Sequence, residues 1–155
     1  MLPERRHARG RGSRMLPERR GGPVSGKKLI VEVAGIVEAP AAAVFDGLAD
    51  ALLPDGRRTG RFTVEDLPGH TSTVEVTDRA ISFQGGWWYR GEWSVEPHPE
   101  GALLTHRVFN VAQWGRWGVP LANRFFIGFA GRTRKGFDEN LAQLGRRLGC
   151  PARPV

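Results

Sequence analysis

The most regular pattern of apolar and polar positions lies late in the chain, between Val119 and Gly149. Residues recur there at steps of three and four, which places them on one stripe of an α-helix. Most charged residues of the segment fall off this stripe, where they can remain in water. The pattern predicts one long amphipathic helix that needs a sheet to lie against. The stripe consists of Phe126, Ala130, Thr133, Phe137, Leu141, Leu144 and Leu148.

Residues 28–37 read KLIVEVAGIV, an alternating segment rich in β-branched side chains. Such a segment predicts a strand that is at least half buried. The next segment, 38–56, has an apolar face at helical spacing, and Pro40 suits a first helical turn because its missing N–H costs nothing there. A Pro-Asp-Gly turn signal at 54–56 ends it. The sequence therefore predicts one strand followed by one or two short helices.

Between residues 59 and 111 the apolar period changes to two, and turns that contain Gly or Pro divide the segment. Strands joined by such short turns must be antiparallel. The predicted strands cover 59–67, 71–77, 80–84, 87–98 and 102–111.

The strand 87–98 has one aromatic and one mainly polar face, as expected for a sheet with one side on an interior. The aromatic face holds Trp87, Tyr89, Gly91, Trp93 and Val95. The polar face holds Trp88, Arg90, Glu92, Ser94 and Glu96, and we expect a solvent-side pair of Arg90 with Glu92. Alternation does not decide which side of strand 102–111 faces the interior. The buried side consists either of Leu104, His106 and Val108 or of Leu103, Thr105, Phe109 and Val111.

These elements predict an α+β fold, a curved antiparallel sheet wrapped around a long C-terminal α-helix, with one or two short helices after the first strand. We predict one domain at 27–149, a basic leader at 1–26 and a short tail at 150–155. The 155 residues are 40% hydrophobic and 25% charged, which suits one globular domain with its own core.

The formal net charge of +7 belongs to the start of the chain. Residues 1–28 hold nine Lys/Arg and two Glu, whereas 29–155 hold 14 basic and 14 acidic residues, so the domain itself gives little reason to expect nucleic-acid binding.

The leader repeats MLPERR at 1–6 and 15–20 and has too little apolar surface to offset chain entropy, so we expect it to be disordered. Two interpretations stay open. One is a duplicated or over-called start, with Met15 or a later codon beginning the functional protein, and the other is a basic arm that contacts nucleic acid or anionic lipid nonspecifically.

A single cysteine, Cys150, excludes an internal disulfide and a cysteine-based metal site, and it fits a reducing cytoplasm. No apolar run approaches the ~20 residues of a membrane-spanning helix. No Gly-rich phosphate loop, His-rich metal spacing or nucleophile elbow occurs. We therefore expect a cytoplasmic monomer or homodimer with no cofactor, no metal, no membrane span and no specific nucleic-acid partner.

Three segments carry a family resemblance: VEVAGIVEAPAAAVFDGLAD at 31–50, GEWSVEPHPEGALLTHRV at 91–108, and the terminal helix. The first resembles an opening strand with a proline-marked helix entry, and the second resembles paired late strands around an acidic turn. Together they resemble the START-like superfamily, also called SRPBCC or helix-grip, which includes polyketide cyclases/dehydrases and lipid-transfer domains. The resemblance covers about 27–149. It implies a cavity between the concave sheet and the terminal helix that can hold an apolar or aromatic molecule.

We expect aromatic side chains to line this cavity, because ligand pockets are mostly apolar with a few polar groups. For the aromatic residues of 87–98, packing behind the helix is the open alternative. For the two tryptophans of the loop before the helix, the alternatives are gating the pocket and packing on the helix base. Thr133 and Asn140 are polar interruptions near the helical stripe, and each either reaches a ligand or caps a buried backbone group. The predicted ligand contacts are Trp87, Tyr89, Trp93, His106, Trp114, Trp117, Phe126, Phe129, Thr133 and Phe137.

Three functions compete. The favoured one is noncatalytic binding or transfer of a hydrophobic or aromatic small molecule, which needs only the fold and an apolar cavity. The second is a cyclase, aromatase or dehydratase, in which His106 or Arg107, with Tyr89, would transfer a proton or stabilise an oxyanion. Neighbours in a strand face opposite ways, so only one of His106 and Arg107 can enter the pocket. The third is an interaction module acting through the basic leader.

Overall fold

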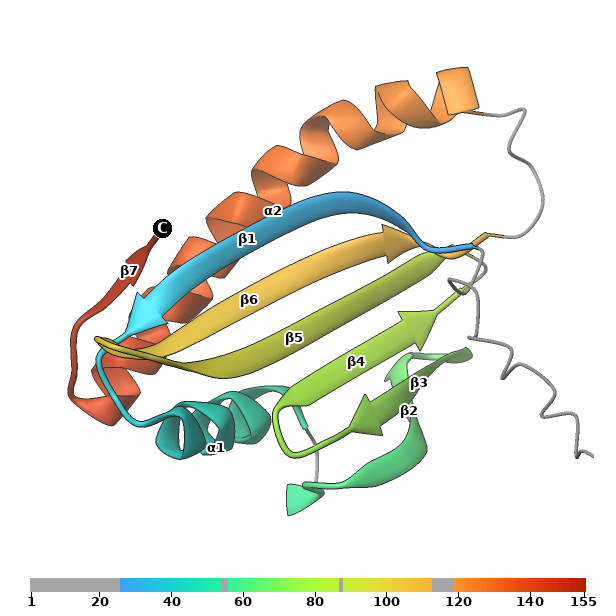
Figure 1. The fold of residues 1–155 in the computed structure, drawn as a ribbon. Helices are drawn as coiled ribbons and strands as arrows, with labels where there is room; N and C mark the ends of the chain where they lie inside the picture. Colours follow the sequence, from blue (N-terminus) through green and yellow to red (C-terminus); the bar gives the residue numbers. More distant parts are fainter. Residues whose placement is uncertain (1–25, 54–55, 87, 113–118) are drawn as a thin grey trace, which may run out of the picture.

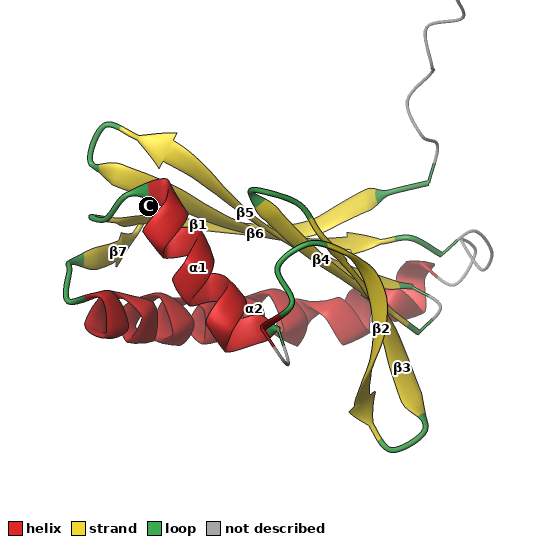
Figure 2. Cartoon of the chain, turned by 90° about the horizontal axis from the view of Figure 1, so that it is seen from below, coloured by secondary structure: helices red, strands yellow, loops and turns green. Residues whose placement is uncertain are grey.

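The described part of the chain folds into one antiparallel sheet that carries the helices α1 and α2 on one face (Figures 1 and 2). The structure, a computed structural model, describes residues 26–53, 56–86, 88–112 and 119–155, and only the backbone at 66 and 119–127. The elements are β1 (Lys28–Val37), α1 (Ala41–Leu52), β2 (Gly60–Leu67), β3 (His70–Val76), β4 (Ala80–Gly85), β5 (Tyr89–His98), β6 (Gly101–Asn110), α2 (Val119–Leu148) and β7 (Ala152–Pro154).

The strand order across the sheet is β2-β3-β4-β5-β6-β1-β7, and every neighbouring pair is antiparallel. The first and sixth strands therefore meet in the sheet although most of the chain separates them. The α+β class, the antiparallel sheet and the long C-terminal helix agree with the sequence analysis. The helix α1 follows β1, and Pro40 occupies the position just before its first turn.

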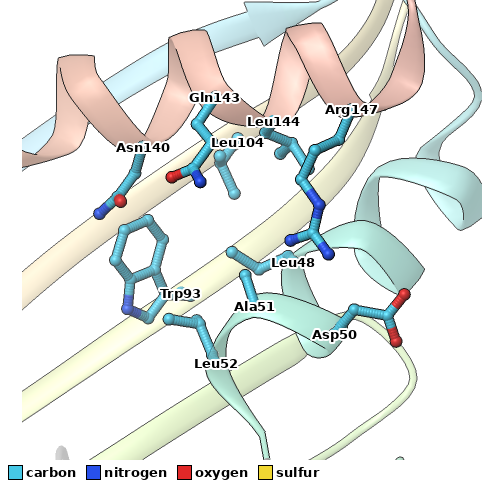
Figure 3. A pocket seen from close by; sticks show the side chains of 10 residues that line it. All are labelled: Leu48, Asp50, Ala51, Leu52, Trp93, Leu104, Asn140, Gln143, Leu144 and Arg147. Carbon is cyan, nitrogen blue, oxygen red and sulfur yellow. The ribbon is translucent and has the colours of Figure 1, made fainter.

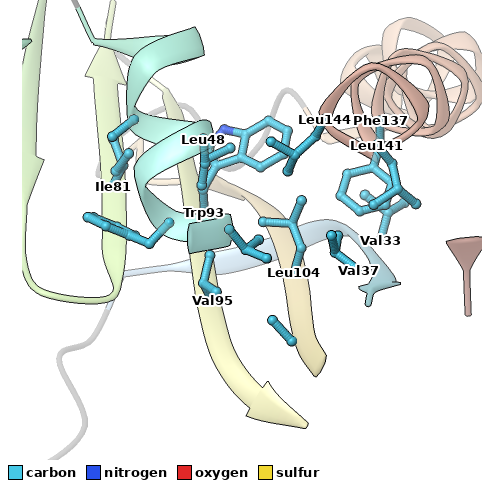
Figure 4. Close-up of a cluster of buried hydrophobic side chains, with 14 of the residues drawn as sticks. Val33, Val37, Leu48, Ile81, Trp93, Val95, Leu104, Phe137, Leu141 and Leu144 are labelled. Atoms are coloured by element: carbon cyan, nitrogen blue, oxygen red, sulfur yellow. The ribbon is translucent and has the colours of Figure 1, made fainter. Parts of the chain in front are cut away.

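The core lies between the helix-bearing face of the sheet and the apolar sides of α1 and α2 (Figure 4). Leu48 comes from α1, Trp93 from β5 and Leu104 from β6. Three residues of the predicted helical stripe, Phe137, Leu141 and Leu144, are buried against them, so α2 presents the expected side to the sheet. Truncating one such side chain to alanine typically costs about 2–5 kcal/mol.

The faces of β6, which alternation left open, are decided by its register. His106 lies opposite Trp93 of β5, and Leu104 lies opposite Val95. Both residues of each pair are buried in the core, so the even-numbered positions of β6 face the helices. Thr105 is also buried, but it lies opposite Ser94 on the outer face of the sheet.

One face assignment was wrong. Alternation placed Trp88 with the polar residues of 87–98, but its ring meets Tyr89 edge-on at 5.6 Å between centroids and Phe129 of α2 at 6.0 Å. Trp88 therefore contacts the helix side. The reason is that β5 begins only at Tyr89, so Trp88 belongs to the preceding turn, where the period of two does not apply.

The C-terminal residues add a strand that the sequence analysis did not predict. Gly149 adopts a left-handed conformation (φ 67°) that ends α2, and the Cys150 N–H donates to the Gly145 carbonyl at 3.0 Å. The chain then turns back so that β7 pairs with the end of β1, with Ala152 opposite Val37. A three-residue segment reading Ala-Arg-Pro has no recognisable period, which is why it was read as a tail.

The turn between β5 and β6 is pressed against the link between β1 and α1. Gly101 follows this turn with φ +132°, and a Cβ there would lie 2.3 Å from the Val37 carbonyl oxygen and 2.8 Å from the Ala39 nitrogen. Both atoms belong to the backbone and cannot turn aside as a side chain can. The contact fixes the start of α1 against the end of the sheet that carries the site described next.

Candidate functional site

A partly open pocket of about 360 Å³ lies between α1 and the C-terminal half of α2, above β5 and β6 (Figure 3). We call it the α1–α2 pocket. Its volume falls within the range of small-molecule sites. It is lined by Leu48, Asp50, Ala51, Leu52, Trp93, Leu104, Asn140, Gln143, Leu144 and Arg147.

The floor of the α1–α2 pocket is apolar and belongs to the core. Leu48, Leu104 and Leu144 are each at most 5% exposed, and Trp93 is 8% exposed. These four side chains come from α1, the sheet and α2, so the floor exists only where the three elements meet. A rigid apolar floor of this kind favours binding of an apolar group without prior rearrangement.

The α2 side of the pocket is polar. Asn140, Gln143 and Arg147 follow one another at steps of three and four, which places them along one side of the helix. Figure 3 shows all three side chains extending from α2 over the apolar floor. Leu144 lies within the same turns and points to the floor, so this side of α2 combines an apolar base with polar side chains above it.

Asp50 and Arg147 bring opposite charges to the pocket, but only Asp50 has an ion-pair partner within the described part of the chain. Its carboxylate pairs with Arg58. For Arg147, the described residues supply no carboxylate within ion-pair distance. The pocket therefore carries one uncompensated positive charge on its α2 side.

Trp93 connects the pocket to a buried aromatic stack. The His106 ring lies nearly parallel to the indole at 4.0 Å between centroids, and the Phe137 ring lies 5.9 Å from it at an interplanar angle of 21°. Desolvation lowers the pKa of His106 to about 4, against an opposing hydrogen bond with the Glu92 backbone. Its Nδ1 atom is buried with no hydrogen-bond partner among the described residues, so the imidazole is neutral at pH 7.

Tyr89 fills the sheet surface next to this stack. A Cβ on Gly91 would lie 2.6 Å from the Tyr89 hydroxyl oxygen, so the phenol lies over the glycine, in space that a larger residue would occupy. Burial raises the pKa of the Tyr89 phenol. Phe129 also packs against the core. In the described residues, these side chains occupy part of the region in which the sequence analysis expected a cavity between sheet and terminal helix.

The predicted ligand contacts are thus divided. Trp93 lines the α1–α2 pocket, whereas Tyr89, His106, Phe129 and Phe137 are associated with the core. The Thr133 hydroxyl donates to the Phe129 carbonyl at 2.9 Å, which is the backbone-capping alternative. Trp87, Trp114 and Trp117, and the side chain of Phe126, lie outside the described residues, and as ligand contacts they stay predictions.

Arg107 points to the outer face of the sheet and pairs with Glu32 of β1. On that same face the Arg90 guanidinium donates to Glu92 at 2.7 Å and to Glu75 at 3.3 Å, which confirms the predicted pair. Burial alone would lower the pKa of Arg90, but Glu92 and Glu75 raise it overall. These charges form a surface network that is separated from the pocket by the sheet.

Most pocket residues were missed by sequence reasoning, which concentrated on aromatic side chains. Two signals were available: the short apolar helix at 41–52, and the row of polar residues beside the α2 stripe, of which only Asn140 was noted.

Within the described ranges, no group of His, Cys, Asp or Glu side chains could hold a metal ion. Neither helix has, in its described residues, a stretch apolar and long enough to cross a membrane.

Comparison with known protein families gives no match, and comparison with curated protein sequences gives none either. Among solved structures, the chain is similar to an uncharacterized protein from Rhizobium leguminosarum, determined at 1.9 Å. The sequence identity is 17%, and the match covers 62% of this chain and 91% of that protein, with a TM-score of 0.25. A likeness at this level supports no inference about fold or function.

Proposed function

We propose that this chain binds a small apolar or aromatic molecule in the α1–α2 pocket and does so without catalysing a reaction. The observation that carries the proposal is the pocket itself, about 360 Å³ with a buried floor of leucine and tryptophan side chains and a polar side on α2. Such a combination is typical of sites that bury an apolar body and orient it with a few polar groups.

We also propose that the fold is of the START-like, helix-grip type. The support is the order of elements: a first strand, a proline-preceded helix, a run of antiparallel strands and a long terminal helix packed on the sheet. If so, the pocket differs from the expected cavity, since it lies toward α1 and the C-terminal half of α2.

Binding is favoured over catalysis by the chemistry of the described lining. The acid–base candidates His106 and Arg107 do not line the pocket. The one carboxylate that does, Asp50, is engaged by Arg58. A general base needs to reach a bound substrate at hydrogen-bond distance, and a pair of such groups does not converge in the described part of the pocket.

The proposal is tested by filling the pocket mouth from its α1 side. Ala51 lines the pocket and is exposed, so Ala51→Trp places an indole in the ligand volume without disturbing the core. We expect it to weaken binding of the neutral fluorescent probe N-phenyl-1-naphthylamine by about tenfold or more, because the probe and the indole compete for one space. Fluorescence titration of the purified protein measures this change.

Ala42→Trp is the matched control, because Ala42 is an exposed alanine of the same helix that does not line the pocket. It should leave the probe affinity unchanged. Native mass spectrometry of the protein as purified, repeated after denaturation, gives an independent readout through a bound mass that is lost on unfolding. Equal affinities for the two tryptophan variants would place the probe elsewhere and contradict the proposal.

A further inference from the structure

We propose that the natural ligand of the α1–α2 pocket is a monocarboxylate with a planar apolar body, whose carboxylate is bound by Arg147 with Asn140 and Gln143 beside it. This inference rests on the proposed function, because it names the chemical class of the molecule that the same pocket binds. It adds a charged group and a fixed orientation, with the carboxylate toward α2 and the body on the leucine and tryptophan floor.

The donors for such a group lie on one side of a single helix. Asn140, Gln143 and Arg147 follow one another along α2 and extend over the pocket (Figure 3). A guanidinium presents five N–H donors in a planar fork that matches a carboxylate, and each amide adds an NH₂ group. Charge-assisted bonds of this kind are about twice as strong as neutral ones.

The charge balance at the pocket selects an anion. Asp50 could in principle neutralise Arg147 from the opposite side, but its carboxylate pairs with Arg58. Arg147 has no carboxylate within ion-pair distance among the described residues, so its positive charge can pair with an anionic ligand. A single unpaired guanidinium matches one carboxylate, whereas a phosphate dianion would leave a negative charge without a counterpart in the described lining.

The shape and chemistry of the floor select the body of the ligand. The Trp93 indole packs against the His106 ring at 4.0 Å and the Phe137 ring at 5.9 Å, so the part of it that lines the pocket is a rigid aromatic surface. Leu48, Leu104 and Leu144 complete an apolar floor. Aromatic pairs in offset or edge-to-face geometry attract one another beyond the burial of their area, which favours a planar aromatic body here.

A structural role for Arg147 is the competing explanation. Arg146 and Arg147 both lie in the last turn of α2, where a positive charge stabilises the carbonyl end of a helix. Arg146 shares this role but does not line the α1–α2 pocket. The two arginines therefore separate the helix-end effect from a ligand contact.

The experiment compares 2-naphthoate with its neutral analogue 2-naphthamide by isothermal titration calorimetry at low salt. We expect the wild-type chain to bind 2-naphthoate about tenfold more tightly than 2-naphthamide. Arg147→Gln should remove most of this preference, because it should weaken binding of 2-naphthoate far more than binding of 2-naphthamide. Arg146→Gln should keep the preference and should lower the melting temperature about as much as Arg147→Gln.

The outcomes separate the two proposals. Equal affinities of the wild-type chain for the two probes, or a preference that survives in Arg147→Gln, would overturn the carboxylate inference and leave the binding function standing. Loss of the preference in both arginine variants would assign it to the general field of the helix end and also overturn the inference. If the wild-type chain binds neither probe, the proposed function fails and the inference fails with it.

Discussion

Lowering the pH from 7 to 4 is expected to destabilise the fold by about 3 kcal/mol through His106 alone. The folded-state pKa is about 4, below the ordinary value of 6.5. Above pH 6.5 the imidazole is neutral in both states and has no effect. As the pH falls below 6.5, His106 binds a proton in the unfolded chain but not in the folded chain, which lowers the free energy of unfolding. This loss is complete only below about pH 4.

Urea unfolding at several pH values between 7 and 4 measures this loss. His106→Gln keeps a polar side chain but cannot titrate. Over the same pH range, the unfolding free energy of this variant should fall by about 3 kcal/mol less than that of the wild-type chain. His70→Gln is the control, because His70 is exposed at the start of β3. Burial alone would raise the pKa of Glu92, but Lys27 and Arg90 lower it overall from its ordinary value of 4.5. The stability that Glu92 contributes is therefore lost mainly below pH 4.5. Parallel pH curves for wild type and His106→Gln would refute the prediction.

Gly101→Ala is expected to cost at least about 3 kcal/mol of unfolding free energy. Two effects add at this position. The backbone has φ +132°, which side-chain-bearing residues rarely adopt, and the new Cβ would lie 2.3 Å from the Val37 carbonyl oxygen. Relief of the clash requires the turn between β5 and β6 to move away from the start of α1, so the α1–α2 pocket should also change shape.

Gly69→Ala separates the two effects. Gly69 lies in the turn between β2 and β3 with φ +79°, and a Cβ there meets nothing within 4 Å. This variant should lose only the conformational term, about 1–2 kcal/mol. Urea unfolding of both variants at pH 7 gives the comparison, and a Gly101→Ala variant no less stable than Gly69→Ala would show that the two chain segments separate at little cost.

Much of the fold follows from local periodicity. The bounds of β1 were predictable from its run of β-branched and apolar residues, and the buried side of α2 was predictable from its helical period. His106 was among the predicted ligand contacts, but alternation did not decide which face of its strand it occupies. The choice of face on β6 needed the pairing of His106 with Trp93, which is a contact between strands and leaves no trace in the alternation of either strand alone.

The pocket was less predictable, for a different reason. It forms where α1 and α2 meet, and these helices are separated by more than sixty residues along the chain. Aromatic residues such as Tyr89 and Phe137 looked like cavity lining, yet they pack with the core. A large aromatic side chain serves either purpose, and which one it serves depends on the distance between helix and sheet, which the sequence of one element does not contain.

The short strand β7 also changes what the sheet presents at one of its two edges. The end of β1 would otherwise present free backbone groups to any passing strand, the arrangement from which edge-to-edge association begins. β7 covers this edge from Ala34 to Val37, with Pro154 opposite Gly35 and with Arg153 paired to Glu100. A segment of three residues that contains a proline and a charge is a poor template for a further strand, so we expect this edge of the sheet to resist pairing with a second molecule.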